Sequence, residues 1–322
     1  MRAITIPRFG DADVLTLSDI PEPPLTPESV LIEVVAAGVN RADIGQRQGN
    51  YPPPPGAPDW PGMEVAGTIL AIGDDVTGWH AGDRVCALIP GGGYAERAVV
   101  DSRLLIPVPA SIELVDAAGI PEAACTVVAN VFLSAGLTAG QTLLVHGGSS
   151  GIGSFAIQLA RALGITVFAT AGSAGKVAFC EQLGATGINY RTEDFAAVIA
   201  ATGGGVDVVL DIVGGEYLAR NIEVLNPGGA IMIIANQSGA PGSFDIGALM
   251  RKRGRIWATT LRARPIEERA VIVSAVSEIV MPLFAEGVIH PVIDTVFPLA
   301  EAADAHRRME SSEHLGKILL GM

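Results

Sequence analysis

In the first third of the chain, short apolar runs alternate with turn residues. The runs are rich in β-branched residues and are bounded by Gly, Pro or Asp, a pattern typical of strands. The proline-rich segment Tyr51–Pro58 suits neither a helix nor a central strand and is predicted to be a stiff loop. Closely spaced strands without long helices favour a small barrel-like β domain. The predicted strands are Arg2–Ile6, Val14–Ile20, Val30–Ala37, Thr68–Ile72, Arg84–Ile89 and Tyr94–Val100.

The pattern changes near residue 120, where continuous apolar runs begin to alternate with helical segments. Continuous runs are expected for strands that helices cover on both faces. The alternation therefore predicts an α/β fold with a doubly wound parallel sheet. The predicted strands are Thr142–Val145, Thr166–Thr170, Thr186–Asn189, Val206–Asp211, Ala230–Ala235 and Arg255–Thr259. The predicted helices are Gly151–Leu163, Ala174–Leu183, Glu193–Ala201 and Tyr217–Leu225.

The last 60 or so residues predict a helix over Ile266–Glu286, a strand over Val292–Phe297 and a short terminal helix. This tail is too small to be a domain, so we expect it to return and complete the first one. A length of 322 residues suits two domains. The predicted division is a β-rich domain at residues 1–121, completed by 262–322, and a nucleotide-binding domain at 122–261.

The composition narrows the possible partners. Apolar residues make up 49% of the chain, which supplies a core and argues against disorder. The net charge of −13 repels anionic surfaces, so neither nucleic acid nor a membrane is an expected partner. One basic stretch, Arg251–Arg264, runs against this trend. It is either a solvated strand edge or subunit rim, or a local attractor for an anionic cofactor.

Cysteine usage and the N-terminus indicate a reducing compartment. Cys86, Cys125 and Cys180 lie far apart and show no metal-like or redox-like spacing. The first residues contain no apolar signal region, and Gly, Pro or charge breaks every apolar run before it reaches membrane-spanning length. We therefore expect a soluble cytoplasmic protein.

A glycine-rich turn, His146–Gly153, follows the first apolar strand of the second half and opens a helix. Small residues let the backbone approach a pyrophosphate, and a helix N-terminus offers free N–H groups and a positive dipole. The strand–turn–helix context makes this signal stronger than a glycine cluster alone. The alternative is a tight turn without a ligand. We expect Ser150 and Gly151 to contact a pyrophosphate, with Ile152 and Gly153 also in the cofactor site.

The end of the next strand predicts which cofactor binds. Sites that prefer NAD usually place a carboxylate there to bind the ribose 2′-hydroxyl. Here Gly172 is followed by Ser173 and Lys176, and no carboxylate is present. A hydroxyl and a cation suit the 2′-phosphate of NADPH, and Tyr190, at the end of the third strand, lies where it can flank that phosphate. The alternative is that Lys176 is an ordinary exposed lysine of a helix and binds no phosphate.

Several segments together resemble the medium-chain dehydrogenase/reductase superfamily. Gly62–Gly67 is similar to its Gly-His-Glu segment, and Gly82–Val85 to its usual turn into a strand. The run Asn40–Gly56 resembles the quinone oxidoreductase branch, in particular its tumour-suppressor-inducible subgroup, as do Pro121–Ala124, Thr170–Ser173 and Gly316–Ile318. The resemblance implies a GroES-like catalytic domain, a Rossmann domain and a C-terminal return to the first. Members of the family pair through the Rossmann domain, and its last predicted strand, Arg255–Thr259, leaves an exposed edge in a monomer, so we expect a homodimer at least.

The resemblance also implies that no metal is bound. Zinc-dependent members supply a Cys before the Asp of the Asn40 loop and a His before the Glu. This chain has Asn40 in that loop, without a nearby Cys, and Met63 before Glu64. Only Cys86 lies in the first 120 residues, so the four-cysteine zinc lobe is missing as well. We expect Glu64 to make a structural hydrogen bond or ion pair instead.

Quinone reduction tolerates the absence of zinc because the acceptor is already electrophilic. We expect Asn40 to hydrogen-bond near the nicotinamide or the acceptor oxygen, and Tyr51 to line the acceptor pocket and donate to a quinone oxygen. Tyr51 as a residue that only packs its loop is an equal alternative. The resemblance places Thr126, Val213 and Asn236 near the nicotinamide half, and Leu261 where the chain crosses back. Two other functions remain open: an NADPH-dependent alkenal or enoyl reductase, and a non-catalytic NADPH-binding sensor.

Overall fold

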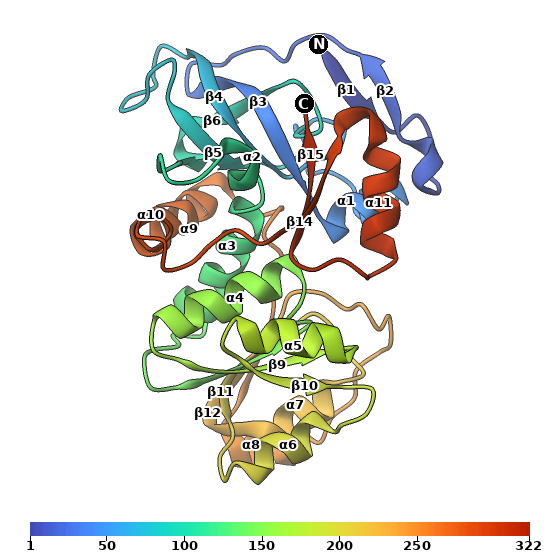
Figure 1. Ribbon diagram of the computed structural model, residues 1–322, viewed down its shortest axis with the longest axis vertical. Coiled ribbons are helices and arrows are strands. Elements are labelled where there is room, and N and C mark those ends of the chain that lie inside the picture. The colour runs from blue at the N-terminus through green and yellow to red at the C-terminus, as the bar shows by residue number, and fades with distance from the viewer. The chain divides into compact units, whose positions relative to one another are not determined.

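A computed structural model describes all 322 residues, and its contacts divide the chain into two compact units (Figure 1). One unit contains Met1–Cys125 together with Leu261–Met322, and the other contains Thr126–Thr260. The C-terminal segment therefore belongs to the same unit as the N-terminus.

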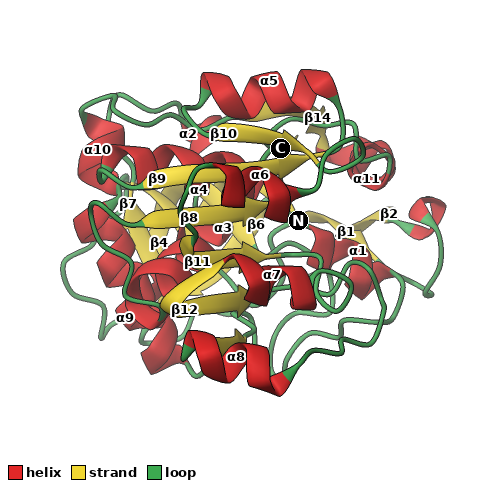
Figure 2. Ribbon diagram, turned by 90° about the horizontal axis from the view of Figure 1, so that it is seen from below, coloured by secondary structure: helices red, strands yellow, loops and turns green.

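The second unit is built on a six-stranded sheet in which every pairing is parallel. The strand order, β10-β9-β8-β11-β12-β13, is 3-2-1-4-5-6 when the strands are numbered along the chain (Figure 2). That order is the doubly wound arrangement of dinucleotide-binding folds, so the predicted fold class is confirmed. The strands are β8 (Thr142–His146), β9 (Thr166–Ala171), β10 (Thr186–Asn189), β11 (Val206–Asp211), β12 (Leu225–Ile233) and β13 (Arg255–Ala258).

The helices of this sheet bury an apolar cluster that includes Leu144, Phe195 and Ile222. Four of the helices were predicted to within two residues at each end. The fifth, α8, was not predicted: it is short, and although Ile246, Leu249 and Met250 recur at helical spacing, none of its residues is buried. The helices are α4 (Gly151–Ala162), α5 (Ala174–Gln182), α6 (Phe195–Ala201), α7 (Leu218–Val224) and α8 (Ile246–Lys252), and a π-helix covers Val128–Ser134.

The first unit is built on a seven-stranded sheet, with a separate antiparallel pair, β1 (Arg2–Thr5) and β2 (Thr16–Asp19). The long strand β3 (Ser29–Val39) pairs with three others, β15, β4 and β6, and so forms the centre of the sheet. Its six companions are β4 (Glu64–Ile72), β5 (Arg84–Leu88), β6 (Arg97–Asp101), β7 (Leu105–Pro107), β14 (Ile293–Pro298) and β15 (Lys317–Gly321). The small helices and 3₁₀ turns are η1 (Ala12–Val14), α1 (Arg41–Arg47), η2 (Ser102–Leu104), α2 (Leu114–Ala117), α3 (Pro121–Val127) and η4 (Leu299–Glu301).

The C-terminal segment differs from its prediction in two respects. The single helix expected over Ile266–Glu286 is wrong: the chain forms α9 (Ile266–Ile279) and α10 (Met281–Ala285). Pro282 has no N–H to continue the helical hydrogen bonds, which explains the break. After α11 (Ala302–Glu310), the unpredicted strand β15 pairs antiparallel with β3, with Ile318 opposite Val39. This pairing brings Lys317 to the end of β3.

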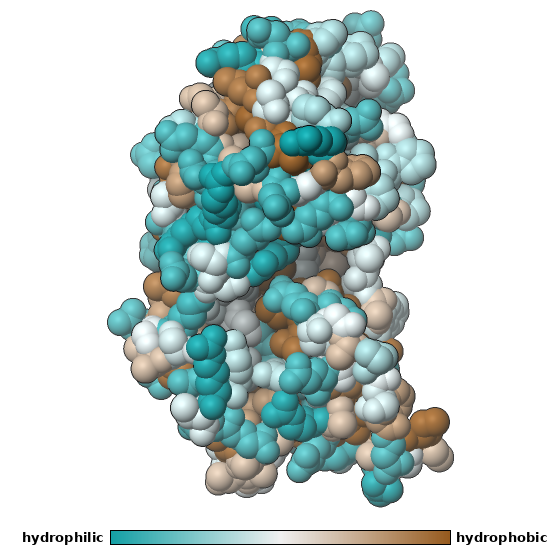
Figure 3. Space-filling model, turned by 90° about the vertical axis from the view of Figure 1, so that its right-hand side faces the viewer, coloured by the Kyte–Doolittle hydropathy of each residue, from teal (hydrophilic) through white to brown (hydrophobic).

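Polar residues cover most of the face seen in Figure 3, with apolar patches between them. No helix combines the length and the apolar character needed to cross a lipid bilayer. All three cysteines are free thiols and buried.

Candidate active site

The polar centre of the first unit lies where β3 ends and α1 begins. Asn40 precedes the helix, and its backbone N–H donates to Asp43 Oδ2 at 2.8 Å. Because Asp43 takes this capping role, the amide of Asn40 can point elsewhere: Nδ2 donates to Glu64 Oε1 at 2.8 Å, and Oδ1 accepts from Lys317 Nζ at 2.8 Å. Local capping thus positions the Asn40 side chain among groups from β4 and β15.

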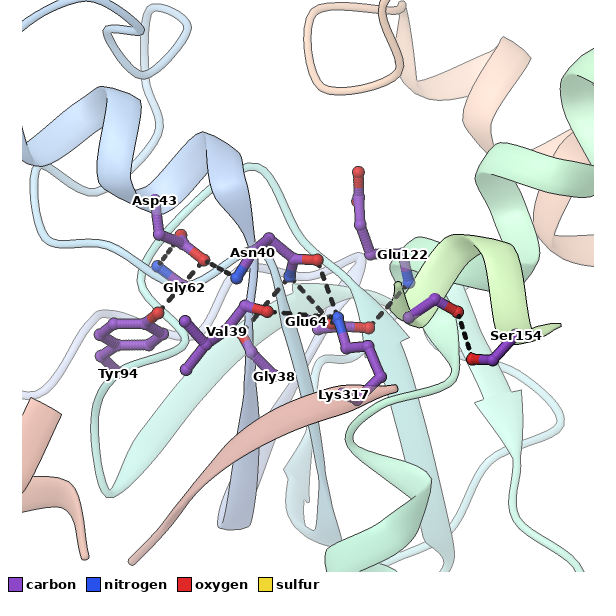
Figure 4. Close-up of polar contacts among 11 residues, drawn as sticks. Gly38, Val39, Asn40, Asp43, Gly62, Glu64, Tyr94, Glu122, Ser154 and Lys317 are labelled. Carbon is purple, nitrogen blue, oxygen red and sulfur yellow. Dashed lines mark hydrogen bonds and ion pairs between the residues drawn. The ribbon is translucent and has the colours of Figure 1, made fainter. Parts of the chain in front are cut away.

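Lys317 and Glu64 form a buried ion pair at this centre, with 2.5 Å between Nζ and Oε1 (Figure 4). Glu64 is 0% and Lys317 6% exposed, so both charges depend on their protein partners. The other oxygen of Glu64 accepts the backbone N–H of Glu122 at 2.8 Å. A Cβ on Gly38 would come within 2.1 Å of Glu64 Oε1, so glycine is required beside this carboxylate.

Behind this pair, a second buried chain of polar groups supports α1. Asp43 Oδ1 accepts the N–H of Gly62 at 3.0 Å, and the Tyr94 hydroxyl lies 3.2 Å from Asp43 Oδ2. Tyr94 in turn lies 3.2 Å from His306 Nε2, and Arg47 lies 3.4 Å from His306 Nδ1. Burial raises the pKa of Asp43 to about 6, and burial together with the Arg47 cation lowers the pKa of His306 to about 3. His306 is therefore neutral, which fits a role in positioning.

Arg262 holds the proline loop that carries Tyr51. Its Nε donates to Pro90 O at 2.6 Å and its Nη2 to Gln46 Oε1 at 2.7 Å. Nη1 lies 3.4 Å from Tyr51 O, and the guanidinium stands 5.4 Å from the centre of the tyrosine ring. The ring is half-buried, and its hydroxyl makes no hydrogen bond within the protein. The loop is thus fixed while the hydroxyl remains available.

The basic stretch was interpreted either as a solvated edge or as an attractor for an anionic cofactor, and neither interpretation holds for Arg262. Its side chain is buried and donates to Gln46 of the same unit. Arg251, Arg253 and Arg255 are exposed, as a solvated edge requires. Sequence reasoning also missed the contacts of Lys317, although its segment Gly316–Ile318 had been matched to the family. No local spacing reveals either residue, because their partners are more than 200 positions away.

The glycine turn of the second unit has the geometry of a phosphate cradle. A Cβ on Gly153 would lie 2.3 Å from Gly147 O, and a Cβ on Gly148 would lie 2.7 Å from the Ala169 Cβ. The Ser150 hydroxyl accepts the N–H of Gly153 at 3.0 Å and so caps α4. The N–H groups of Gly151 and Ile152 have no intrahelical acceptor at this end, which leaves them for an anion.

The ends of β9 and β10, which are neighbours in the sheet, bring the next set of predicted residues together. Ser173 is exposed and caps α5 by accepting the N–H of Lys176 at 3.3 Å. Lys176 is half-buried, and Tyr190 is exposed. A Cβ on Gly172 would lie 2.6 Å from the Tyr190 hydroxyl, so the missing side chain lets Tyr190 lie against β9.

A buried network, which sequence reasoning missed, orders the remaining strand ends of this unit. His146 bonds Thr170 Oγ1 at 3.0 Å and Asn221 Oδ1 at 2.8 Å, and Asn221 donates to Asp211 at 3.0 Å. Asp211 then accepts the N–H of Val213 at 2.7 Å. Burial lowers the pKa of His146 to about 4, so the ring is neutral and works as a positioning group.

The other predicted cofactor residues have local roles. Asn236 Oδ1 accepts the N–H of Gly215 at 3.3 Å and shapes the loop after β12. Thr126 is buried, and its carbonyl accepts from Asn130 at 2.8 Å. Leu261 is buried and begins the C-terminal segment of the first unit.

Comparison with known proteins covers almost the whole chain. An alcohol dehydrogenase GroES-like domain model matches residues 26–110, and a zinc-binding dehydrogenase model matches residues 183–320. A quinone oxidoreductase of Rattus norvegicus is 34% identical over 99% of this chain and 97% of its own. The chain belongs to the medium-chain dehydrogenase/reductase superfamily. The resemblance found in the sequence is thereby confirmed, and the protein is an oxidoreductase.

Solved structures of this superfamily have the same fold. The structure of Escherichia coli quinone oxidoreductase complexed with NADPH is 28% identical, with a TM-score of 0.87 and full coverage of both chains. The CurK enoyl reductase structure is 27% identical, with a TM-score of 0.86 over 100% of this chain and 99% of that one.

The zinc that one family description implies does not fit the residues of this oxidoreductase. Met63 presents a buried thioether, and Asn40 presents an amide that is already bound on both sides. The nearby carboxylate of Glu64 is neutralised by the ammonium of Lys317. A thioether, an amide and a paired carboxylate are poor substitutes for thiolate and imidazole ligands.

Proposed function

We propose that this oxidoreductase reduces quinones with NADPH and without zinc. The observation that carries the proposal is the Asn40–Glu64–Lys317 cluster, in which the carboxylate and the amide are paired with an ammonium group instead of being open to a metal. Oxidation of an alcohol requires a Lewis acid or a base to help remove its proton, whereas a quinone is already electrophilic and its aromatic product stabilises charge. Positioning of donor and acceptor supplies most of the acceleration, up to roughly 7–11 kcal/mol. Full-length similarity to a quinone oxidoreductase supports the same acceptor class.

For the cofactor, we propose that the N–H groups around Ser150, Gly151, Ile152 and Gly153 bind the pyrophosphate. The tight backbone packing there supports this, since any larger side chain fills the space. Bound NADPH supplies the hydride, and the protein orients it. Further cofactor contacts in this proposal are the 2′-phosphate residues Gly172, Ser173, Lys176 and Tyr190, and the nicotinamide-side residues Asn40, Thr126, Val213, Asn236 and Leu261.

For the acceptor, we propose Tyr51 as the residue that donates a hydrogen bond to the quinone oxygen. Its loop is held by Arg262 and its hydroxyl is unbound, which suits a ligand better than a packing role. We assign Asn40 to the same site, where its amide fixes the positions of Glu64 and Lys317.

Tyr51→Phe is expected to lower kcat/KM for quinones by about tenfold, the effect of losing one hydrogen bond of ~1.4 kcal/mol. The dissociation constant of NADPH is expected to stay the same, because the cofactor does not use this hydroxyl. Steady-state kinetics and a fluorescence titration of NADPH give both numbers. If kcat/KM of Tyr51→Phe for quinones equals that of the parent, Tyr51 only packs its loop.

The experiment that tests the function is NADPH consumption with a panel of acceptors containing a quinone and an alkenal. We expect the quinone to be preferred, with turnover that survives a chelator and with no stoichiometric zinc in the protein. The similarity to an enoyl reductase structure makes the alkenal the second candidate. If the alkenal is preferred, the protein is an alkenal reductase and not a quinone reductase. If NADPH binds but no acceptor is reduced, the protein is a sensor.

We further propose a homodimer in a reducing, cytoplasmic setting, which the free thiols fit. The outer edge of β13 is unpaired, and Trp257 on it is 50% exposed. Ile246 and Met250 on α8, the helix that precedes β13 in the chain, are 67% and 72% exposed, so this part of the unit has free backbone groups and exposed apolar side chains. Sedimentation at micromolar concentration is expected to give a dimer, and Trp257→Glu is expected to give monomers. A monomeric parent protein contradicts the proposal.

A further inference from the structure

The carboxyl group of Glu122 differs from every other acid in the polar centre of the first unit. Glu122 lies at the start of α3, where its backbone N–H is fixed on Glu64 Oε2 at 2.8 Å. Its side chain points away from the Glu64–Lys317 pair in Figure 4. The residue is half-buried, and its carboxyl group makes no hydrogen bond within the protein. The backbone is thus anchored while the acid group remains free to meet a ligand.

The surroundings of Glu122 favour its protonated form. Burial, and then the negative charge of Glu64, raise its pKa to about 8. Lys317 opposes this shift but already neutralises Glu64, and Arg262 is committed to Gln46 and Pro90. The ionisable groups that face Glu122 are Glu64 on β4, Lys317 on β15, Asp43 on α1, Arg262, Tyr51 on the proline loop and Cys125 on α3 itself.

The neighbouring groups are poorer proton donors at neutral pH. Asp43, with a pKa of about 6, is mostly ionised and accepts bonds from Asn40, Gly62 and Tyr94. The pKa of Tyr51 is raised by burial and by Glu122, so its hydroxyl holds its proton strongly. The Lys317 ammonium is taken up by Glu64 and Asn40. Glu122 alone combines an unbound carboxyl group with a proton that it can release near neutral pH.

We propose that Glu122 is the proton donor of the reaction, a role that rests on the function proposed above. The hydride brings one proton and two electrons to the acceptor. As the second oxygen–hydrogen bond of the hydroquinone forms, the O–H bond of the Glu122 carboxyl group breaks, and its electron pair stays on the carboxylate. Water then reprotonates the carboxylate, so that one quinone, one NADPH and one proton give one hydroquinone and one NADP⁺.

The test compares Glu122→Gln and Glu122→Asp with the parent enzyme in kcat, its pH profile and the dissociation constant of NADPH. The parent kcat is expected to fall as pH rises through about 8, where the carboxyl group loses its proton. Glu122→Gln keeps the shape of the side chain but has no acidic proton, so kcat is expected to fall about 10²-fold, at the low end for general acids. The decrease of kcat above pH ~8 is also expected to disappear. Glu122→Asp keeps a carboxyl group, so its kcat should be lower than that of the parent but should still decrease at high pH. Glu113→Gln, which removes an exposed carboxylate earlier in the chain, serves as the matched control and should change neither.

The outcomes separate the two proposals. A parent enzyme that reduces no quinone overturns the proposed function and, with it, this role. A parent that reduces quinones while Glu122→Gln keeps its kcat and its pH limb overturns the proton-donor role alone. The proton-donor role is also overturned if Glu122→Gln weakens NADPH binding as much as it lowers kcat, because Glu122 then supports the structure of the site. Unchanged thermal unfolding of Glu122→Gln and the retained limb of Glu122→Asp exclude misfolding as the cause.

Discussion

Replacing Lys317 by Met is expected to lower the free energy of unfolding by about 3–5 kcal/mol, the usual effect of removing one partner from a buried ion pair. The substitution leaves Glu64 fully buried with an uncompensated charge, held only by the amide of Asn40 and the N–H of Glu122. Met is similar in length and fills the space, so the loss measures charge rather than a cavity. Denaturant unfolding of both proteins gives the difference.

Two variants control this prediction. The double variant Lys317→Met with Glu64→Gln removes both charges, and it should recover most of the loss because a buried pair adds little net stability by itself. Arg307→Ala removes the exposed contacts of Arg307 to Asp13 and Asp304 and should leave the free energy of unfolding nearly unchanged. If Lys317→Met is as stable as the parent, Glu64 does not depend on the ammonium group.

Lys176→Ala is expected to weaken NADPH binding by about tenfold and to leave NADH binding nearly unchanged. The 2′-phosphate of NADPH carries close to two negative charges at neutral pH, and NADH has a hydroxyl in its place. A charge-assisted hydrogen bond is worth about 1.5–3 kcal/mol. Lys176 is half-buried, so solvent and salt reduce that value toward ~1.4 kcal/mol, which is one decade of affinity.

Titrations of both cofactors against the parent and Lys176→Ala provide the measurement. Salt should weaken NADPH more than NADH in the parent, and this difference should shrink in the variant. Lys252→Ala is the matched control: Lys252 is another lysine of the same unit, and its ammonium donates to Leu225 O at 2.6 Å. If Lys176→Ala weakens the binding of NADPH and NADH equally, Lys176 supports the fold and does not contact the 2′-phosphate. A parent protein that binds NADH more tightly than NADPH overturns the cofactor assignment.

Features encoded by neighbouring residues were predictable from the sequence. Strand β10 (Thr186–Asn189) and the start of α4 at Gly151 were predicted with their observed bounds, because turn and capping residues flank them. The glycine turn was recognised from its place between a strand and a helix, and the backbone shows why Gly148 and Gly153 have no room for a side chain. The sequence also predicted that Asn40 and Met63 hold no zinc, and this stays a prediction that metal analysis of the protein tests.

Other features depended on residues that only the folded chain brings together. Lys317 meets Glu64 across 253 positions, and Arg262 meets Gln46 across 216, so no local pattern encodes either contact. Strand β15 is too short to show a period, and it forms because β3 offers it an edge. No role of Glu122 was predictable from the sequence, because its raised pKa comes from burial beside Glu64. The sequence by itself therefore determined most strands and helices of the parallel-sheet unit, the place of the glycine turn and the family. The tertiary structure decided the chemistry of the polar centre, because the charge state of a buried group is set by neighbours that only folding supplies.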